Sequence, residues 1–435
     1  MAGTTVHPAQ DTRPLLSDTE RERVYRRNFS LFLSDFVIFT IAMNFIGSTT
    51  VIPDFVRKLT DFEVLIALSG QLFEVGWLLP QLFVARSLVR VENKKWWFIG
   101  PNIPVRLLIL SFAGIIVILG PDRPGLMLGL FLLFYGLAAL GDGLVGVPWV
   151  DLVGSSLDGR RRARLFGLGN ATVGVLVLGL APIVDMILGD SGPEYPNNYA
   201  LLFGLAGVLF VVTIPLGLFI RELPGGKPQE TAPPMREYLP DLLRVLREDK
   251  PYRGMIITRV LAALFTLAAP FYIGLATERL DISSDTAVST ALAVQTVGSV
   301  TGALFFSWLG DRRALQFIRM ALFIAVLQPS LALLAILVGP LPLYVAFLAG
   351  GFVAGSLGIS FINWVIAYAT PEQRPVYSGL FNSVSAVALF AAPLTGGTIV
   401  EVLGYEAVFI VALVIILAAL TVALRYVHAP AHSAV

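Results

Sequence analysis

The sequence contains no cysteine in 435 residues and only three histidines, His7, His428 and His432, all close to the ends of the chain. The absence of cysteine excludes disulfide bonds, thiolate metal sites and a cysteine nucleophile. Because histidine is confined to the polar tails, a histidine-based active site or metal site elsewhere in the chain is excluded as well. We therefore expect no resident metal and no cofactor.

Charged residues are also scarce, at 14% of the chain against about 25% in an average soluble protein, whereas hydrophobic residues reach 56%. The mean hydropathy is +0.78. A soluble protein of this size would lack the polar surface to cover its exterior, so we expect a lipid bilayer to be the solvent. The net charge of +1 gives no indication of nucleic-acid binding.

Twelve apolar stretches are long enough to cross a bilayer as helices, since a crossing needs about 20 mostly apolar residues. They lie near residues 29–53, 62–86, 97–120, 126–148, 165–189, 199–220, 254–276, 284–309, 315–338, 341–367, 376–400 and 405–426. Open strands could not satisfy their backbone groups in lipid, and the strands of a barrel would alternate in polarity. The expected fold is therefore an all-α integral membrane protein with twelve transmembrane helices.

The distribution of Lys and Arg indicates which side of the membrane the ends of the chain face. Of the 31 basic residues, 25 lie in the two tails and in the loops on their side, four lie in the opposite loops, and two lie within spans. The positive-inside rule then places both termini in the cytoplasm. We expect a multi-pass protein of the plasma (inner) membrane.

The longest polar interruption runs from Arg221 to Arg253 and divides the spans into six and six. It contains an amphipathic stretch, residues 238–247, which we interpret as a short surface helix in a linker. The expected organisation is a cytoplasmic tail (1–28), an N-terminal six-helix bundle (29–221), the cytoplasmic linker (222–252), a C-terminal six-helix bundle (253–427) and a second cytoplasmic tail (428–435).

Short matches between the two halves predict that the bundles are related by pseudo-symmetry. Residues 167–170 of the fifth span match 379–382 of the eleventh, and Gln71 of the second span matches Gln295 of the eighth. These matches occur in the same order in both halves and at similar offsets. Two parallel six-helix halves with a substrate site at their interface are one of the architectures of secondary transporters.

Residues 307–313, with the sequence SWLGDRR, resemble the signature loop G-x-x-x-D-R-x-G-R-[RK] of the major facilitator superfamily. Ser307 and Ala314 stand in place of two of its glycines, and the first-half copy at 85–90 lacks the acidic residue. A proline at the end of the first span, here Pro53, is a further point of resemblance to this family. The resemblance covers essentially the whole chain and implies a bacterial-type secondary transporter with twelve helices in two pseudo-symmetric bundles.

The resemblance also implies a gate on the cytoplasmic face, made of loop ion pairs that break as the transporter changes state. The residues it assigns to this gate are Arg161, Asp311, Arg312 and Arg374. The fourth span lacks the arginine that proton-driven drug exporters of the superfamily typically place there, which argues against a drug:proton antiporter of that kind.

Five ionisable residues lie within spans, where each costs roughly 2.5–3.5 kcal/mol on insertion scales and therefore requires a reason. They are Asp35, Glu74, Arg106, Asp142 and Arg259. Arg106 and Asp142 lie at similar depth on consecutive antiparallel helices, which predicts an ion pair with either a structural or a coupling role. Asp35 either pairs with a cytoplasmic arginine or takes part in coupling.

For Glu74 two interpretations stay open, a proton carrier or a protonated or hydrogen-bonded acid that holds the second helix to its neighbour. Arg259 either binds an anionic group of a substrate or extends toward the membrane interface. Three neutral polar residues within spans, Gln71, Gln295 and Asn382, can join helices or orient a substrate.

These features predict a secondary active transporter that moves a small organic solute by alternating access, as a monomer and with the proton as the first candidate for a coupling ion. Export of an amphipathic compound is the direction we favour. The alternatives are a proton-linked importer of a sugar or organic acid and a non-transporting, permease-like sensor. We expect no enzyme, because no nucleophile–base set lies at membrane depth, and no ATP-driven motor, because no phosphate-binding loop motif occurs.

Overall fold

The computed structural model describes residues 18–80, 94–157, 159–222, 246–309, 314–368 and 374–428. Within these ranges the ordered elements are helices, with no β-strand. Eleven of the described helices are long and apolar enough to cross a membrane. The all-helical membrane fold expected from the sequence is confirmed.

The helices follow the predicted spans closely along the chain. The first half consists of α1 (Asp18–Phe45), α2 (Val51–Arg57), α3 (Glu63–Leu78), α5 (Lys94–Leu119), α6 (Pro124–Ser156), α7 (Gly159–Leu188) and α8 (Asn197–Phe219). The second half consists of α10 (Lys250–Leu264), η1 (Phe265–Ala268), α11 (Phe271–Gly274), η2 (Leu275–Arg279), α12 (Ser284–Leu309), α13 (Ala314–Val338), α14 (Leu341–Tyr368), α15 (Arg374–Leu403) and α16 (Tyr405–Arg425). The seventh predicted span is thus a composite of four short segments, and Pro270, which has no backbone N–H, stands at its main interruption.

The first span differs from its expected position. The apolar part of α1 runs from Glu22 to Phe45, and a turn at residues 46–50 separates it from α2. Pro53 occupies the third position of α2. Proline is tolerated in the first turn of a helix because the N–H groups there have no intrahelical partner. Pro53 therefore lies at the start of a second, short helix instead of closing the first span.

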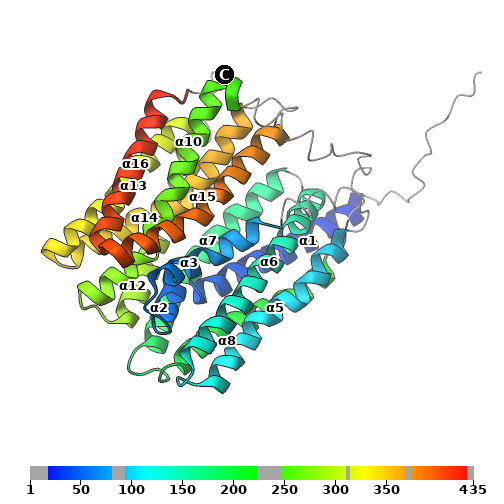
Figure 1. Ribbon diagram of the computed structural model, residues 1–435. Coiled ribbons are helices and arrows are strands. Elements are labelled where there is room, and N and C mark those ends of the chain that lie inside the picture. The colour runs from blue at the N-terminus through cyan, green and yellow to red at the C-terminus, as the bar shows by residue number, and fades with distance from the viewer. Residues whose placement is uncertain are drawn as a thin grey trace, which may run out of the picture.

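The helices pack as two bundles with equivalent neighbours (Figure 1). In the first bundle α1 packs against α7 and α8, α3 against α6, and α5 against α6 and α8. In the second bundle α10 packs against α15 and α16, α12 against α14, and α13 against α14 and α16. Each pair of the first bundle has its counterpart at the same place in the order of spans of the second. The predicted pseudo-symmetry of two six-helix bundles is confirmed.

One helix contact shows how small residues set this packing. A Cβ atom on Gly351 of α14 would overlap with the backbone carbonyl of Gln295 on α12. Glycine therefore lets the two backbones touch, as small residues commonly do between membrane helices. This close contact fixes the height of Gln295 relative to α14.

The bundles meet through two equivalent contacts, α3 with α15 and α7 with α12. We call the side that carries the start of α1 and the end of α16 the terminus side, and the opposite side, which carries α2, the far side. Figure 1 shows the bundles diverging toward the terminus side. The hydrogen bonds and ion pairs that join described residues of the two bundles lie on the far side. The structure is therefore closed on the far side.

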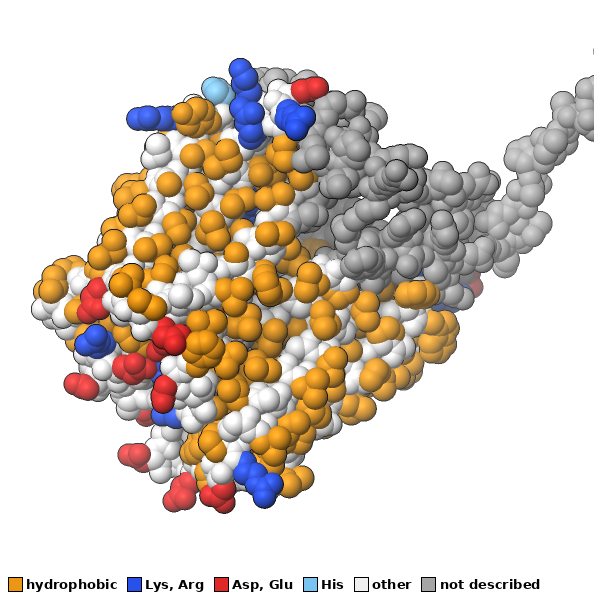
Figure 2. All heavy atoms as spheres, viewed as in Figure 1, with side chains coloured by type: hydrophobic (Ala, Val, Ile, Leu, Met, Phe, Trp, Pro, Cys, Tyr) orange, Lys and Arg blue, Asp and Glu red, His pale blue; other side chains and the backbone are white. Residues whose placement is uncertain are grey.

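The outer surface is suited to lipid. Figure 2 shows hydrophobic side chains across the middle of the visible face of both bundles, with charged side chains gathered at its ends. Individual residues are strongly exposed, such as Ile118 at 83% and Leu337 at 81%. An apolar belt of this extent would be unfavourable in water and is expected of a multi-pass membrane protein.

Candidate functional site

Two opposite charges face each other across the bundles at mid-depth. Glu74 comes from α3 of the first bundle and Arg259 from α10 of the second, and their charges interact electrostatically. Glu74 is surrounded by protein on most sides, yet its side chain is exposed to solvent. The space between α3 and α10, which we call the inter-bundle space, is therefore accessible to water.

The position of Arg259 is determined by three neighbours within its own bundle. Its guanidinium carbon lies 5.3 Å from the ring centre of Phe361 and 5.7 Å from that of Phe381. Its Nε–H donates a hydrogen bond of 3.0 Å to the Ser385 hydroxyl. The side chain is thus held in place by α14 and α15, and it does not extend toward the membrane interface.

The predicted neutral residues occupy different settings around this space. Gln71 is buried on α3, one turn before Glu74, and Gln295 is half-buried on α12 at the contact with α14. Asn382 is exposed on α15, the helix that packs against α3. Their roles in helix contacts or in solute binding remain predictions.

The first bundle contains a second, fully buried group of charges. Arg106 of α5 and Asp142 of α6 form an ion pair of 2.9 Å, in which each side chain is only 7% exposed. The ion pair that equal depth predicts is therefore present. Asp35 of α1 lies within electrostatic range of both residues and accepts a 2.8 Å hydrogen bond from the Trp149 indole. Among the described residues, Arg106 is the cation that acts electrostatically on Asp35. Pairing with a cytoplasmic arginine and a role in coupling both remain predictions for Asp35.

The two intramembrane arginines have similar aromatic surroundings and different counter-ions. Arg106 lies 4.7 Å from the ring centre of Phe39 and 5.2 Å from that of Phe210. Arg259 also lies between two phenylalanine rings. Such contacts of a cation with aromatic rings are favourable, more so when the pair is removed from water. Arg106 has a carboxylate of its own bundle in direct contact, whereas Glu74, the described carboxylate that acts electrostatically on Arg259, belongs to the other bundle.

The far side is closed by residues of α2 that the sequence did not indicate. Arg57 pairs with Glu278 of the second bundle at 2.5 Å, lies 3.7 Å from Glu63, and donates a long hydrogen bond of 3.4 Å to the Tyr405 hydroxyl. Burial opposes the charge of Arg57, but the oxygen groups around it outweigh burial and raise the pKa of Arg57 above its usual value. Arg57 is therefore a fixed positive charge at the centre of this closure.

A second connection runs from the same short helix. Asp54 accepts a hydrogen bond of 2.5 Å from the Tyr199 hydroxyl of its own bundle and one of 3.2 Å from Ser284 of the other bundle. Nearby, Ser289 donates to Asp185 at 2.9 Å, again across the bundles. Asp54 and Arg57 together tie α2 to both halves.

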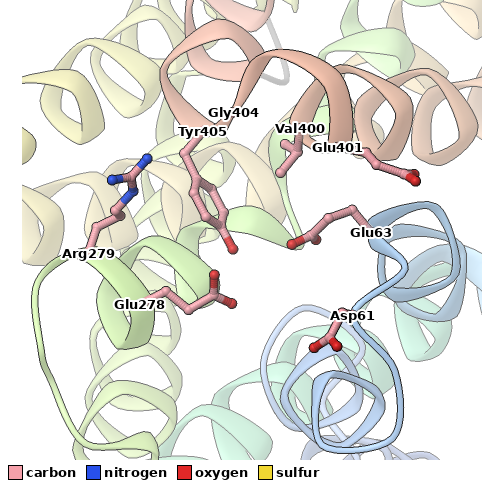
Figure 3. A pocket seen from close by; sticks show the side chains of 8 residues that line it. All are labelled: Asp61, Glu63, Glu278, Arg279, Val400, Glu401, Gly404 and Tyr405. Atoms are coloured by element: carbon pink, nitrogen blue, oxygen red, sulfur yellow. The ribbon is translucent and has the colours of Figure 1, made fainter.

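A pocket of about 460 Å³ opens beside this closure on the far side. Figure 3 shows Glu63, Glu278 and Tyr405 pointing toward one another from three different elements. Asp61 and Glu401 add two further carboxylates to its wall. In the described part of the chain no group of acidic or histidine side chains is arranged to hold a metal ion. The pocket is a predominantly acidic hollow at the junction of the bundles.

The predicted gate on the terminus side is only partly within the described residues. Arg161 pairs with Glu22 of α1 at 2.7 Å, a contact within the first bundle. Arg374 is the first residue of α15. Asp311 and Arg312 lie outside the described residues, as does most of the amphipathic stretch of the predicted linker (residues 238–245). The gating role of these four residues remains a prediction.

Comparison with known proteins gives a family match for part of the chain and fold matches for most of it. Residues 277–435 match the sequence model of the Major Facilitator Superfamily. The fold is similar over 92% of this chain and 99% of the other to a mutant of the nucleoside transporter NupG, with a TM-score of 0.65 and 13% identity. The C-terminal part of the chain thus matches the sequence model of this superfamily, and the chain as a whole has the fold of these transporters.

Two further transporter structures have the same fold. A D-xylose-proton symporter matches with a TM-score of 0.64 and 13% identity, over 93% of this chain and 97% of its own. The human organic anion transporter MFSD10 matches with a TM-score of 0.61 and 17% identity, over 92% and 99%. No curated protein sequence matches the chain significantly. At these identities the structural likenesses establish the fold alone.

Proposed function

We propose that this protein is a proton-coupled secondary transporter that moves a small organic solute through the inter-bundle space by alternating access. The observation that carries the proposal is the presentation of Glu74 and Arg259 from opposite bundles. Both side chains are described, yet no ion pair within 4.0 Å joins them. The two charges are thus close enough to interact electrostatically and far enough apart for a ligand to enter between them.

The depth of the two residues supports this assignment. Glu74 is about 16 Å along α3 from its far-side start, and Arg259 about 14 Å along α10 from its terminus-side start, at 1.5 Å per residue. Together these lengths equal the roughly 30 Å of the hydrocarbon core. The two side chains therefore lie at one level near the middle of the membrane, where a transporter has to bind its solute from either side.

We propose that Glu74 carries the proton. An opposite charge favours the ionised form of a carboxyl group, so the proton affinity of Glu74 depends on its distance from Arg259. At an effective dielectric constant of about 20, moving two unit charges from about 6 Å to about 12 Å apart changes their interaction by about 1.4 kcal/mol, a tenfold change in proton affinity. Motion of the bundles would therefore load and unload Glu74.

The buried group in the first bundle supports the proton as the coupling ion. Asp35 and Asp142 share the single positive charge of Arg106. An uncompensated negative charge in a buried site is costly, and a proton on one carboxyl group removes it. We propose that Arg106 and Asp142 stabilise the bundle and that Asp35 takes up a proton when the cluster is exposed.

We propose that the terminus side is cytoplasmic, as the distribution of basic residues indicates, and that the protein works as a monomer in the plasma membrane. Figure 2 agrees with this orientation, because Lys and Arg gather where the chain ends and Asp and Glu prevail at the opposite end. The structure then represents the state that is closed to the outside.

Two directions of transport are consistent with this mechanism. Export of an amphipathic compound is the direction favoured by the sequence, whereas the opposite charges of Glu74 and Arg259 favour the alternative, a proton-linked importer. The two differ in the sign of a pH change. When solute leaves loaded vesicles, a symporter carries protons out with it and the interior becomes alkaline, whereas an antiporter makes it acidic.

The test uses purified protein in liposomes that contain a pH-sensitive dye and are loaded with a solute that stabilises the protein against heat. A protein-dependent pH change that is lost in Glu74→Gln and kept in Glu401→Gln, an exposed far-side carboxylate, is expected. Solute movement without a pH change would exclude proton coupling. Binding without movement would indicate the permease-like sensor and overturn the proposal.

A further inference from the structure

We propose that the transported solute is an organic anion and that Arg259 binds its carboxylate group. The inference rests on the proposed function in one respect, namely that the solute occupies the inter-bundle space. It goes beyond that function because it names the chemical class of the solute and the residue that selects it.

The first argument is the state of the Arg259 side chain. A guanidinium group has five N–H donors, and Arg259 uses its Nε–H in the bond to Ser385. Its two terminal amino groups form no hydrogen bond with any described residue, while the Phe361 and Phe381 rings keep the plane of the group in place. The end of the guanidinium group remains free for two parallel hydrogen bonds, the geometry that a carboxylate accepts.

The second argument is the comparison with Arg106. That arginine lies between two phenylalanine rings in the same way, and Asp142 of α6 completes its site with a 2.9 Å ion pair. The helix α14, which contributes the Phe361 ring to the Arg259 site, contains no acidic residue. Arg259 therefore has the aromatic surroundings of a completed arginine site without the carboxylate. We infer that the solute supplies it.

The third argument concerns Glu74, the carboxylate that faces this position from the other bundle. When ionised it repels an incoming anion, and when protonated it does not. Binding of the proton and binding of the solute anion therefore favour each other, as reciprocal linkage requires. This cooperativity is the property that a proton–anion symporter needs.

The experiment compares matched pairs of compounds that differ only in charge, benzoate with benzamide and hexanoate with hexanamide. Binding to the purified full-length protein is measured by thermal stabilisation and titration calorimetry. We expect at least one carboxylate to bind and its amide to fail. Arg259→Gln should weaken carboxylate binding about 10- to 100-fold, the effect of losing hydrogen bonds to a charged group.

Two controls make the result specific. Arg279→Gln removes an exposed arginine at the far-side pocket and should leave binding unchanged. Arg259→Lys keeps the charge without the paired donors and should give an intermediate affinity, which also provides a measurement if the glutamine variant does not fold. Glu74→Gln should keep carboxylate binding and remove its dependence on pH.

Several results would overturn the proposal. These are equal binding of acid and amide, undiminished binding by Arg259→Gln, or no binding by any carboxylate. Tighter binding of phenylalanine, a zwitterion, that requires Glu74 would show that both charges hold the solute and would also overturn it. Carboxylate binding that depends on Arg259 without any pH change in vesicles would leave this inference intact and refute proton coupling alone.

Discussion

The closure of the far side by Arg57 gives a quantitative prediction about the conformational equilibrium. Arg57→Gln removes the 2.5 Å ion pair with Glu278 and the bond to Tyr405. The Arg57 side chain is only 12% exposed and that of Glu278 42%, so the pair is neither fully solvated nor fully buried. Its loss should cost the closed state about 1–2 kcal/mol, between the values for exposed and buried pairs.

A change of this size shifts the ratio of far-side-open to far-side-closed molecules about 5- to 30-fold toward the open state. The chain has no cysteine, so labels can be attached to introduced cysteines without any background. Asp190 and Glu401 are exposed on the far side of the first and second bundle, respectively. With spin labels at these two positions, the fraction of molecules with a long distance between the labels should be larger in Arg57→Gln than in the unchanged protein.

Labels at Arg164 and Arg253, exposed near the terminus side of the two bundles, should report the reciprocal shortening. The matched control is Arg279→Gln, which removes a neighbouring arginine that forms no described ion pair across the bundles. Unchanged distance distributions in Arg57→Gln, with the protein folded and monodisperse, would refute the role of Arg57 in holding the far side closed.

Three further predictions concern the membrane interior. Asp142→Asn should lower the free energy of unfolding by about 3–5 kcal/mol because it leaves Arg106 buried without its partner. Combining it with Arg106→Gln should restore part of the loss. An unchanged free energy of unfolding in the single variant would contradict this. Glu74→Gln should abolish the solute-driven pH change in vesicles while solute exchange continues, and a retained pH change would remove Glu74 from coupling. Trp149→Phe should cost about 1–3 kcal/mol in a denaturation experiment by leaving Asp35 without its indole donor, and a neutral effect would show that water replaces it.

Much of the architecture could be predicted from the sequence because lipid leaves few options. A membrane segment has to satisfy its own backbone, so a long apolar run is a helix almost by necessity. The depth of a charge along such a helix follows from 1.5 Å per residue, and this is why the pair of Arg106 and Asp142 could be predicted before the structure.

The closure on the far side could not be predicted in this way. Arg57 and Glu278 are separated by about half of the chain, and their contact depends on how the bundles are set against each other. The aromatic surroundings of Arg259 likewise combine Phe361 and Phe381 from two helices whose rotation is decided by packing. A hydropathy pattern gives the position of a helix along the chain. It does not determine which residues of that helix face a neighbouring helix. The first span was displaced for a local reason, since the apolar residues of α2 continued its pattern beyond the turn at 46–50.

The geometry of α2 has a consequence for how the outer entrance opens. Asp54 and Arg57 are three residues apart and project from the same side of one rigid helical turn. A rotation of that turn large enough to release one of them displaces the other as well. Opening should therefore be an all-or-none event, with no long-lived intermediate in which only one of the two residues has lost its contacts.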